Sequence, residues 1–212
     1  MDKMELEKEL DKSLNELRKT EPRKFSQTVD LIINLQKYDL KKNALNLFIP
    51  VPHKIKDKKI CAFLEVKNKD IETVTREEFR KYSDKKQVKL LANKFDFFIA
   101  QASIMPSVAT TFGRALGPSG KMPSPQIGIL ENADERTIKE LIARINKSVK
   151  IRTKESSIKL AIGNEKMSNQ EIIENIMVVY NAVLKALSKG KENLRNIEVK
   201  FTMTKPYKIR LN

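Results

Sequence analysis

The sequence has one cysteine, Cys61, one histidine, His53, and no tryptophan. A single cysteine excludes an internal disulfide and is typical of a reducing compartment. One cysteine and one histidine are too few ligands for an ordinary zinc site. No stretch approaches the roughly 20 apolar residues of a membrane-spanning helix, and residues 1–5 show no apolar secretory signal. We therefore expect a cytoplasmic protein with no metal site and no membrane partner.

Positive charge, in contrast, is in excess. Lys and Arg number 42 against 27 Asp and Glu, which gives a net charge of +15. Such an excess repels itself unless a polyanion lies nearby, and nucleic acid is the usual polyanion for a protein of this sign. Lysines gather at residues 37–59 and 199–212. Any one cluster is more often a solvated face, but several clusters together favour a polyanion partner.

Both ends of the chain carry the patterns of helices and half-buried strands. Leucines at helical spacing predict a helix over residues 3–19, which Pro22 should end. Ser168 and Glu171 form a capping box before an apolar-faced helix, for which Gly190 is the expected stop. Alternation of apolar and polar residues predicts four strands: residues 28–35, 45–49, 158–162 and 197–203.

The middle of the chain has a different pattern. Short, nearly continuous apolar runs at residues 60–64 and 95–100 are typical of strands buried on both faces. Alternating strands and helices over this stretch predict a small layered α/β domain. Helical periodicity predicts three helices in it: about 76–93, 102–115 and 138–145.

Neither end of the chain alone has enough strands and helices to close a core, whereas the two ends together do. We therefore predict a discontinuous split α+β domain, built from residues 1–59 and 150–212. The α/β domain of residues 60–149 is inserted into it. The two crossings, near residues 57–61 and 148–153, should permit rigid-body motion between the domains.

Residues that could carry catalysis are scarce. His53 lies in a proline-rich loop with no nucleophile motif anywhere in the chain, so catalysis by it is not expected. A Gly/Pro-rich loop is predicted at residues 117–125. It fails the phosphate-loop pattern, which needs an earlier glycine and a Ser or Thr after the Gly-Lys pair. We therefore expect no enzyme activity and no cofactor.

The same loop contains a bare Gly-x-x-Gly, from Gly117 to Gly120, with Lys121 after it. Single-strand-binding domains use such a loop to clamp a nucleic-acid backbone. A match of four residues with a proline inside is weak, and a structural turn is the commoner origin of such a match. These residues are therefore a secondary RNA contact or a structural loop.

Aromatic side chains fall mostly in core-like positions. Phe63, Phe97 and Phe201 lie within the apolar runs and are predicted to pack in the interior. Phe25 differs, because it follows Arg23 and precedes the first strand at a loop edge. Packing and base stacking are equally compatible with its position. Since exposed aromatics are few, shape-directed binding of folded RNA fits better than single-strand stacking.

Five segments of the chain, taken in order, resemble one known family. Residues 95–102 (FDFFIAQA), 116–123 (LGPSGKMP) and 163–167 (GNEKM) closely resemble the universal large-subunit ribosomal protein L-one family. Residues 23–29 and 199–203 match its two terminal signatures. The residues of these segments resemble archaeal members of the family more than bacterial or eukaryotic ones. The eukaryotic counterpart is called L-ten-a.

The resemblance implies both an architecture and a function. The inserted domain is then a Rossmann-like three-layer α/β domain, joined to the terminal domain by a hinge. The protein is then a monomer within the ribosome, where it binds large-subunit rRNA and builds the mobile stalk beside the E site. There it helps deacylated tRNA leave. Relatives also repress translation by binding a similar site on their own mRNA.

The resemblance also implies which residues bind RNA. The family's Lys-Phe before the first strand maps to Lys24 and Phe25, with Thr28 on that strand. Its Thr-Met-Gly maps to the end of the last predicted strand. The expected RNA-binding residues are Arg23, Lys24, Phe25, Thr28, Lys54, Lys166, Lys200, Thr202, Met203 and Thr204.

Thr204 departs from the family, which has glycine at this position. Glycine permits close backbone approach and unusual dihedral angles, whereas a β-branched residue is stiff and bulky. Either the RNA contact shifts, or the Thr204 hydroxyl replaces a backbone contact. Alternation along the last strand predicts that Thr202 and Thr204 both point outward from a polar edge.

Three alternative functions remain. A free-standing mRNA repressor would use the same surface outside the ribosome. An α/β enzyme would use the glycine loop, although its motif fails. A single-strand binder of the Gly-x-x-Gly type would prefer unstructured oligonucleotides to a folded stem-loop.

Overall fold

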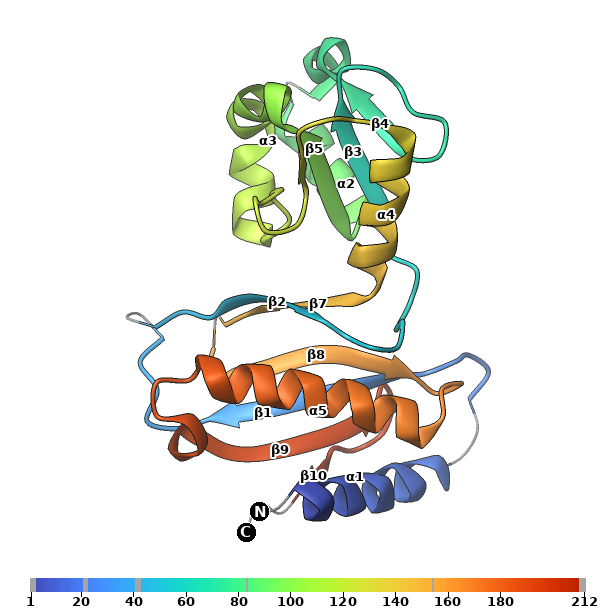
Figure 1. Cartoon of the computed structure of the whole chain (residues 1–212), viewed down its shortest axis with the longest axis vertical. Helices are drawn as coiled ribbons and strands as arrows, with labels where there is room; N and C mark the ends of the chain where they lie inside the picture. Colours follow the sequence, from blue (N-terminus) through green and yellow to red (C-terminus); the bar gives the residue numbers. More distant parts are fainter. Residues whose placement is uncertain (1–2, 21–22, 41–42, 83, 154, 210–212) are drawn as a thin grey trace. The chain divides into compact units, whose positions relative to one another are not determined.

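The computed structural model describes residues 3–20, 23–40, 43–82, 84–153 and 155–209 (Figure 1). Pro22, predicted to end the first helix, lies outside these residues. The chain forms two compact units, of which the first joins residues 1–56 to 147–212 and the second is residues 57–146. These boundaries lie a few residues before those predicted. None of the helices in the described ranges has the length and apolar character needed to cross a membrane.

The first unit is built on an antiparallel sheet of four strands in the order β10-β9-β1-β8. Two helices cover it, and their apolar faces share one core with the buried face of the sheet (Figure 1). A separate two-stranded ribbon packs its Ile49 and Ile151 into the same core. The elements of the unit are α1 (Lys3–Arg18), β1 (Thr28–Leu35), β2 (Asn46–Pro50), β7 (Ser148–Arg152), β8 (Ser157–Asn164), α5 (Asn169–Ala186), the 3-10 turn η3 (Gly190–Asn193), β9 (Leu194–Phe201) and β10 (Tyr207–Ile209).

The strand periodicity and the capping box predicted for this unit are confirmed. Strand β1 alternates between buried and half-buried residues along its whole length, as its period of two predicts. The capping box is present: Ser168 accepts a hydrogen bond from the Glu171 amide, and the Glu171 carboxylate accepts one from the Ser168 amide at 2.8 Å. Hydrogen bonds from Ser168 hold the pKa of Glu171 below its ordinary value.

Two predictions for this unit are wrong in detail. The last predicted strand ends at Phe201, and residues 202–204 form a turn. Helix α5 ends at Ala186, before Gly190, which instead has a φ of 52° at the start of η3. The strand predicted at 45–49 is present as β2, which pairs with β7 in the separate ribbon. Strand β7 itself was not predicted.

The second unit is a parallel sheet in the order β4-β3-β5-β6, with helices on both faces. In Figure 1, α4 lies on one face of this sheet and α2 on the other. The mixed fold class is therefore as expected, with a parallel sheet buried on both sides. Its elements are β3 (Ile60–Leu64), β4 (Glu72–Thr75), the 3-10 turn η1 (Arg76–Tyr82), α2 (Lys85–Lys94), β5 (Phe97–Gln101), the 3-10 turn η2 (Ala102–Ile104), α3 (Met105–Ser119), β6 (Ile129–Leu130) and α4 (Glu135–Asn146).

Two predictions here are also wrong in detail. The helix predicted over 76–93 is divided into η1 and α2, because Asp84 caps α2 by accepting a hydrogen bond from the Lys86 amide at 3.1 Å. The predicted glycine loop begins later, since α3 continues through Gly117 to Ser119. Gly120 then closes the helix with a φ of 72°, the left-handed conformation that glycine adopts at little cost.

An aromatic cluster forms the centre of the second unit. The ring of Phe112, on α3, is fully buried and lies 4.8 Å from the ring of Phe63 and 5.1 Å from that of Phe79, centroid to centroid. We expect Phe112→Ala to lower the free energy of unfolding by about 3–5 kcal/mol, because it leaves a cavity that close-packed neighbours fill only in part. Urea denaturation followed by circular dichroism measures this loss.

The control is Leu90→Ala on α2, whose side chain is 69% exposed. This change should alter the stability by no more than about 0.5 kcal/mol. Equal losses in the two variants would contradict the assignment of Phe112 to the core.

Candidate nucleic-acid interface

Three segments that are far apart in the sequence meet at one end of the main sheet. Strand β1 begins where its neighbours β8 and β9 end, because it runs antiparallel to both. Thr28 therefore lies opposite Asn164, and Val29 lies opposite Phe201. This is the right-hand end of the sheet in Figure 1. We call residues 23–28, 164–167 and 202–204 the sheet-end surface.

The turn after β9 is bonded to the start of β1. The Thr202 hydroxyl accepts a hydrogen bond from the Thr28 amide at 3.1 Å, and the Thr202 amide donates to the Thr28 carbonyl at 3.1 Å. The Met203 amide donates to the side-chain oxygen of Gln27 at 3.2 Å. The Thr202 hydroxyl therefore has a structural partner within the protein.

Gln27 and Glu165 join the second pair of segments. The Gln27 amide donates to the Glu165 carboxylate at 2.9 Å, and the Glu165 amide donates to the Gln27 carbonyl at 2.9 Å. Ser26 also hydrogen-bonds to the side chain of Asn164. Gln27 is only 2% exposed, so it is a positioning residue. Sequence reasoning missed both Gln27 and Glu165, because reciprocal bonds between distant segments leave no periodic signal.

Arg18, at the end of α1, holds the loop after β8. Its guanidinium donates to the carbonyl of Glu165 at 2.9 Å, to that of Met167 at 2.5 Å and to the side-chain oxygen of Asn169 at 2.7 Å. The planar fork of an arginine suits several acceptors at once. Arg18 was also missed, since one cation in a charged helix carries no distinguishing pattern.

Around these bonded groups, other side chains extend into solvent. Phe25 is 52% exposed and Met203 is 60% exposed, so neither is a core residue. The structure thus excludes core packing for Phe25, whereas its stacking on a base stays a prediction. Arg23, Lys24 and Lys166 are also exposed. Two apolar side chains beside three cations form a surface that can contact sugars or bases and phosphates together.

Thr204 fits its turn without backbone strain. Its hydroxyl accepts a hydrogen bond from the Phe201 amide at 2.9 Å, and its amide donates to the Phe201 carbonyl at 3.1 Å. The only non-glycine residue with a positive φ in the described ranges is Lys37. The expected strand alternation is wrong at Thr202 and Thr204, because both lie in a turn and bond to the backbone. Thr202 is nevertheless exposed, as expected, whereas Thr204 is half-buried.

Two of the expected cations are outside the three segments of the sheet-end surface, although Lys200 is only one residue before the end of β9. Lys200 is opposite Asp30 in the register of β9 and β1. Burial raises the pKa of Asp30, and the charge of Lys200 opposes that rise. Lys54 follows His53, whose ring lies 2.7 Å from the Glu174 carboxylate, so Lys54 is placed beside α5.

The glycine-loop residues belong to the second unit and have structural roles. The Lys121 ammonium donates to the carbonyls of Ala92 at 2.7 Å and Phe95 at 2.8 Å, which ties the end of α2 to the end of α3. Gly120 forms the cap of α3 described above. The Lys121 ammonium is thus engaged by backbone carbonyls of its own unit, and a contact of these residues with RNA stays a prediction.

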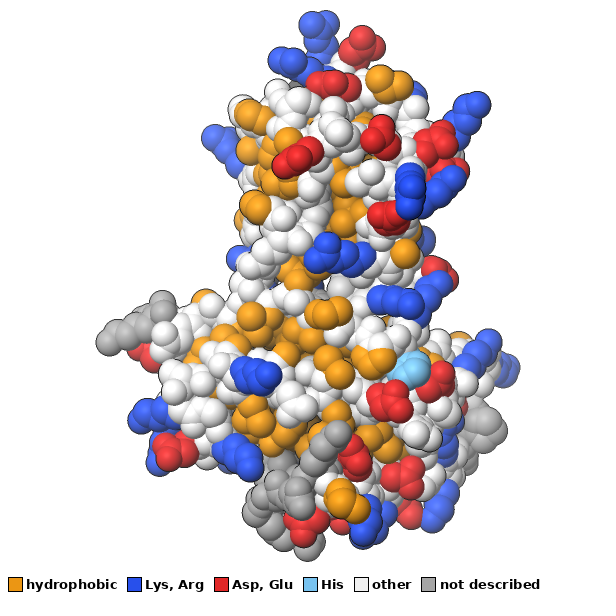
Figure 2. Space-filling view, viewed as in Figure 1, with side chains coloured by type: hydrophobic (Ala, Val, Ile, Leu, Met, Phe, Trp, Pro, Cys, Tyr) orange, Lys and Arg blue, Asp and Glu red, His pale blue; other side chains and the backbone are white. Residues whose placement is uncertain are grey.

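Charge elsewhere on the first unit is mixed. Figure 2 shows basic and acidic side chains interspersed with apolar ones on the face that carries α5. His53 exemplifies this, since its ring lies between two carboxylates, 3.7 Å from Glu171 and 2.7 Å from Glu174. The side chain thus joins the loop after β2 to α5.

Known proteins resemble this chain over nearly its whole length. Residues 17–205 match the model of the Ribosomal protein L1p/L10e family. The large ribosomal subunit protein uL1 of Methanothermococcus thermolithotrophicus is 36% identical, over 89% of this chain and 91% of the relative. The uL1 protein of Pyrobaculum arsenaticum is 36% identical over 92% and 89%, and that of Methanococcus vannielii 37% over 92% and 94%, respectively.

The three hydrogen bonds by which Arg18 holds the loop after β8, called here the Arg18 clamp, can be tested. We expect Arg18→Ala to speed amide hydrogen exchange at residues 165–167 by about tenfold, equivalent to about 1.4 kcal/mol of local stability. Arg18→Lys should speed exchange at these residues almost as much as Arg18→Ala, because an ammonium group cannot replace the planar fork of a guanidinium. Exchange measured by nuclear magnetic resonance gives the comparison.

Lys19→Ala is the matched control, since Lys19 directly follows α1 and its ammonium pairs with the exposed Glu16 of that helix at 2.6 Å. It should leave exchange in the loop unchanged. A loop as protected in Arg18→Ala as in the control would rule out the clamp.

Proposed function

Because this chain belongs to the Ribosomal protein L1p/L10e family, we propose that it binds large-subunit rRNA through the sheet-end surface. As a member of this family, it is a structural constituent of the large ribosomal subunit and is not an enzyme. Its place is the ribosome in the cytoplasm. One observation supports this choice of surface. Hydrogen bonds join three segments at the end of the sheet, and Phe25 and Met203 are exposed there beside cationic side chains.

The surface suits a folded RNA more than a free strand. Its backbone is held by hydrogen bonds from Thr202, Gln27 and Glu165, so little ordering is needed when RNA binds. Lys24 and Lys166 can neutralise phosphates, and Met203 can pack against a sugar or a base. Rigid contacts of this kind recognise the shape of an RNA.

Within the ribosome, we propose that the protein builds the mobile stalk beside the E site and assists release of deacylated tRNA. The chain passes between its units at residues 56–57 and 146–147. Rotation about two such crossings would let the second unit move while the first stays on rRNA. Subunits that lack this protein should then release E-site tRNA more slowly.

Binding to its own mRNA would use the same surface. A free protein presents the sheet-end surface to any RNA that copies the fold of the rRNA site. Repression is therefore proposed as a second role of one site. Sedimentation separates the two roles, since the constituent sediments with large subunits and the repressor stays in the supernatant with mRNA.

The glycine segment gives no support to an enzyme. Gly117 and Gly120 lie at the C-terminal end of α3, where the helix dipole is negative. Phosphate groups bind at the opposite end of a helix, where free amides point outward. The motif therefore lies at the wrong end of its helix to hold a nucleotide.

The Met203 side chain provides a direct test, because none of the bonds given above involves it. We expect Met203→Ala to weaken binding to a stalk-rRNA stem-loop by about tenfold, or about 1.4 kcal/mol. Met4→Ala is the matched control, since Met4 is 64% exposed on α1. A gel shift that compares the stem-loop with a scrambled RNA measures both, and equal affinity of the two variants would remove Met203 from the site.

Salt should weaken the complex strongly. If about six phosphates are neutralised, the affinity should fall by about a thousandfold between about 50 and 200 mM salt. Lys24→Ala should reduce the slope by about one unit, whereas Lys191→Ala, in η3 beyond the other end of β1, should not. A response to salt that is flat in the wild-type protein would count against a phosphate-based contact.

A further inference from the structure

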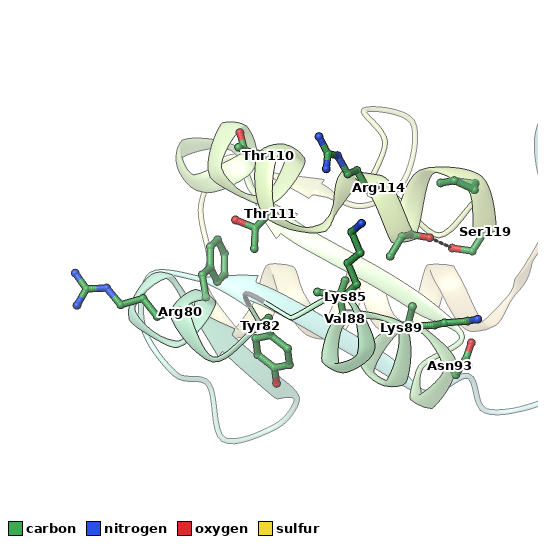
Figure 3. Close-up of a pocket in the computed structure, with 14 residues that line it drawn as sticks. Arg80, Tyr82, Lys85, Val88, Lys89, Asn93, Thr110, Thr111, Arg114 and Ser119 are labelled. Carbon is green, nitrogen blue, oxygen red and sulfur yellow. Dashed lines mark hydrogen bonds between the residues drawn. The ribbon is translucent and has the colours of Figure 1, made fainter.

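A groove in the second unit has no role in the proposed rRNA contact. It lies between α2 and α3, beside η1, and has a volume of about 1140 Å³ (Figure 3). Helix α2 has 10 residues and is therefore about 15 Å long, so the groove can accommodate about three turns of another helix.

The floor of the groove is apolar and fixed in place. Val88 and Ala92 of α2 line it together with Ala115 of α3. The rings of Phe79 and Tyr82 also line it, and both pack on the fully buried Phe112, at 5.1 Å and 5.5 Å between centroids. A floor held by this cluster is preformed, as ligand-binding clefts usually are.

The rim of the groove is basic. Arg80, Lys85, Lys89 and Arg114 line it, all four are exposed, and no Asp or Glu is among the lining residues. Figure 3 shows Lys85 extending from α2 toward α3, with Arg114 on the helix above it. Within the described parts of the chain, no ion pair neutralises any of the four. Their charges are therefore available to an acidic partner.

We propose that this groove binds an acidic amphipathic helix of a protein partner. Leucine-like side chains on one face of the helix would enter the apolar floor, and Asp or Glu on its flanks would pair with the basic rim. This is the helix-in-groove mode of recognition. A contact of about three helical turns is small and typical of transient complexes, so the dissociation constant of the peptide should be about 10–100 μM.

The floor favours a peptide over an RNA strand. Bases bind by stacking on exposed aromatic faces. Here Phe79 is only 8% exposed, and both rings of the groove already pack against Phe112. Aliphatic walls between two helices fit branched apolar side chains better than flat bases.

The test uses the full chain labelled with ¹⁵N and a synthetic amphipathic peptide. The peptide has about 16 residues, with leucines at helical spacing on one face and glutamates elsewhere. We expect chemical-shift changes at residues 76–119 that centre on η1, α2 and α3. A peptide with serine in place of leucine, and one with lysine in place of glutamate, should each cause none.

Charge reversal on the rim gives the matched comparison. Lys85→Glu and Lys89→Glu should each weaken peptide binding by about fivefold or more, whereas Lys86→Glu, on the same helix but outside the lining, should change it less than twofold. Equal effects at the three positions, or shift changes outside the groove, would overturn the proposal. So would tighter binding of an oligouridine strand to the groove. All three variants should still bind the stalk-rRNA stem-loop normally, so failure here is distinguishable from failure of the rRNA contact.

Discussion

The pairing of β1 with both β8 and β9 is the constraint on which the first unit depends. Its partners are more than a hundred residues away in sequence, so the two ends of the chain form one core only when these strands pair. Closing so long a loop costs entropy. The buried side chains of α1, α5 and the sheet offset that cost by leaving water together. The second unit can be inserted because its own sheet and aromatic cluster form a separate core.

The same pairing produces the sheet-end surface. One start and two ends of strands meet there, and the connecting segments must satisfy their backbone groups without further strand partners. Thr202, Gln27, Glu165 and Arg18 supply those partners. Because these polar groups are bonded within the protein, the side chains between them, Phe25 and Met203 among them, face solvent. The geometry of the strand ends therefore decides which residues form hydrogen bonds within the protein and which side chains are exposed to RNA.

Thr204 shows how a substitution can be accommodated at such a place. Where the resemblance leads one to expect glycine, this chain places a hydroxyl that accepts a hydrogen bond from the Phe201 amide. The turn then needs no left-handed residue. The groove of the second unit also follows from packing. Its helices are amphipathic because one face of each is buried in the core, and the residues beside that face form the apolar floor and the basic rim.

Periodicity in the sequence determined strands β1, β2, β3, β5, β8 and β9, the long helices and the capping box at Ser168, because each depends on residues within a few positions of one another. Strands β4, β6, β7 and β10 were not predicted. Charge and composition determined the class of partner to expect. Tertiary structure alone decided that β2 pairs with β7, that the last strand stops at Phe201 and that α3 runs through Gly117. It also decided the roles of Arg18, Gln27 and Glu165, since a hydrogen bond between residues about 140 positions apart depends on the folded path of the chain, which no local pattern encodes.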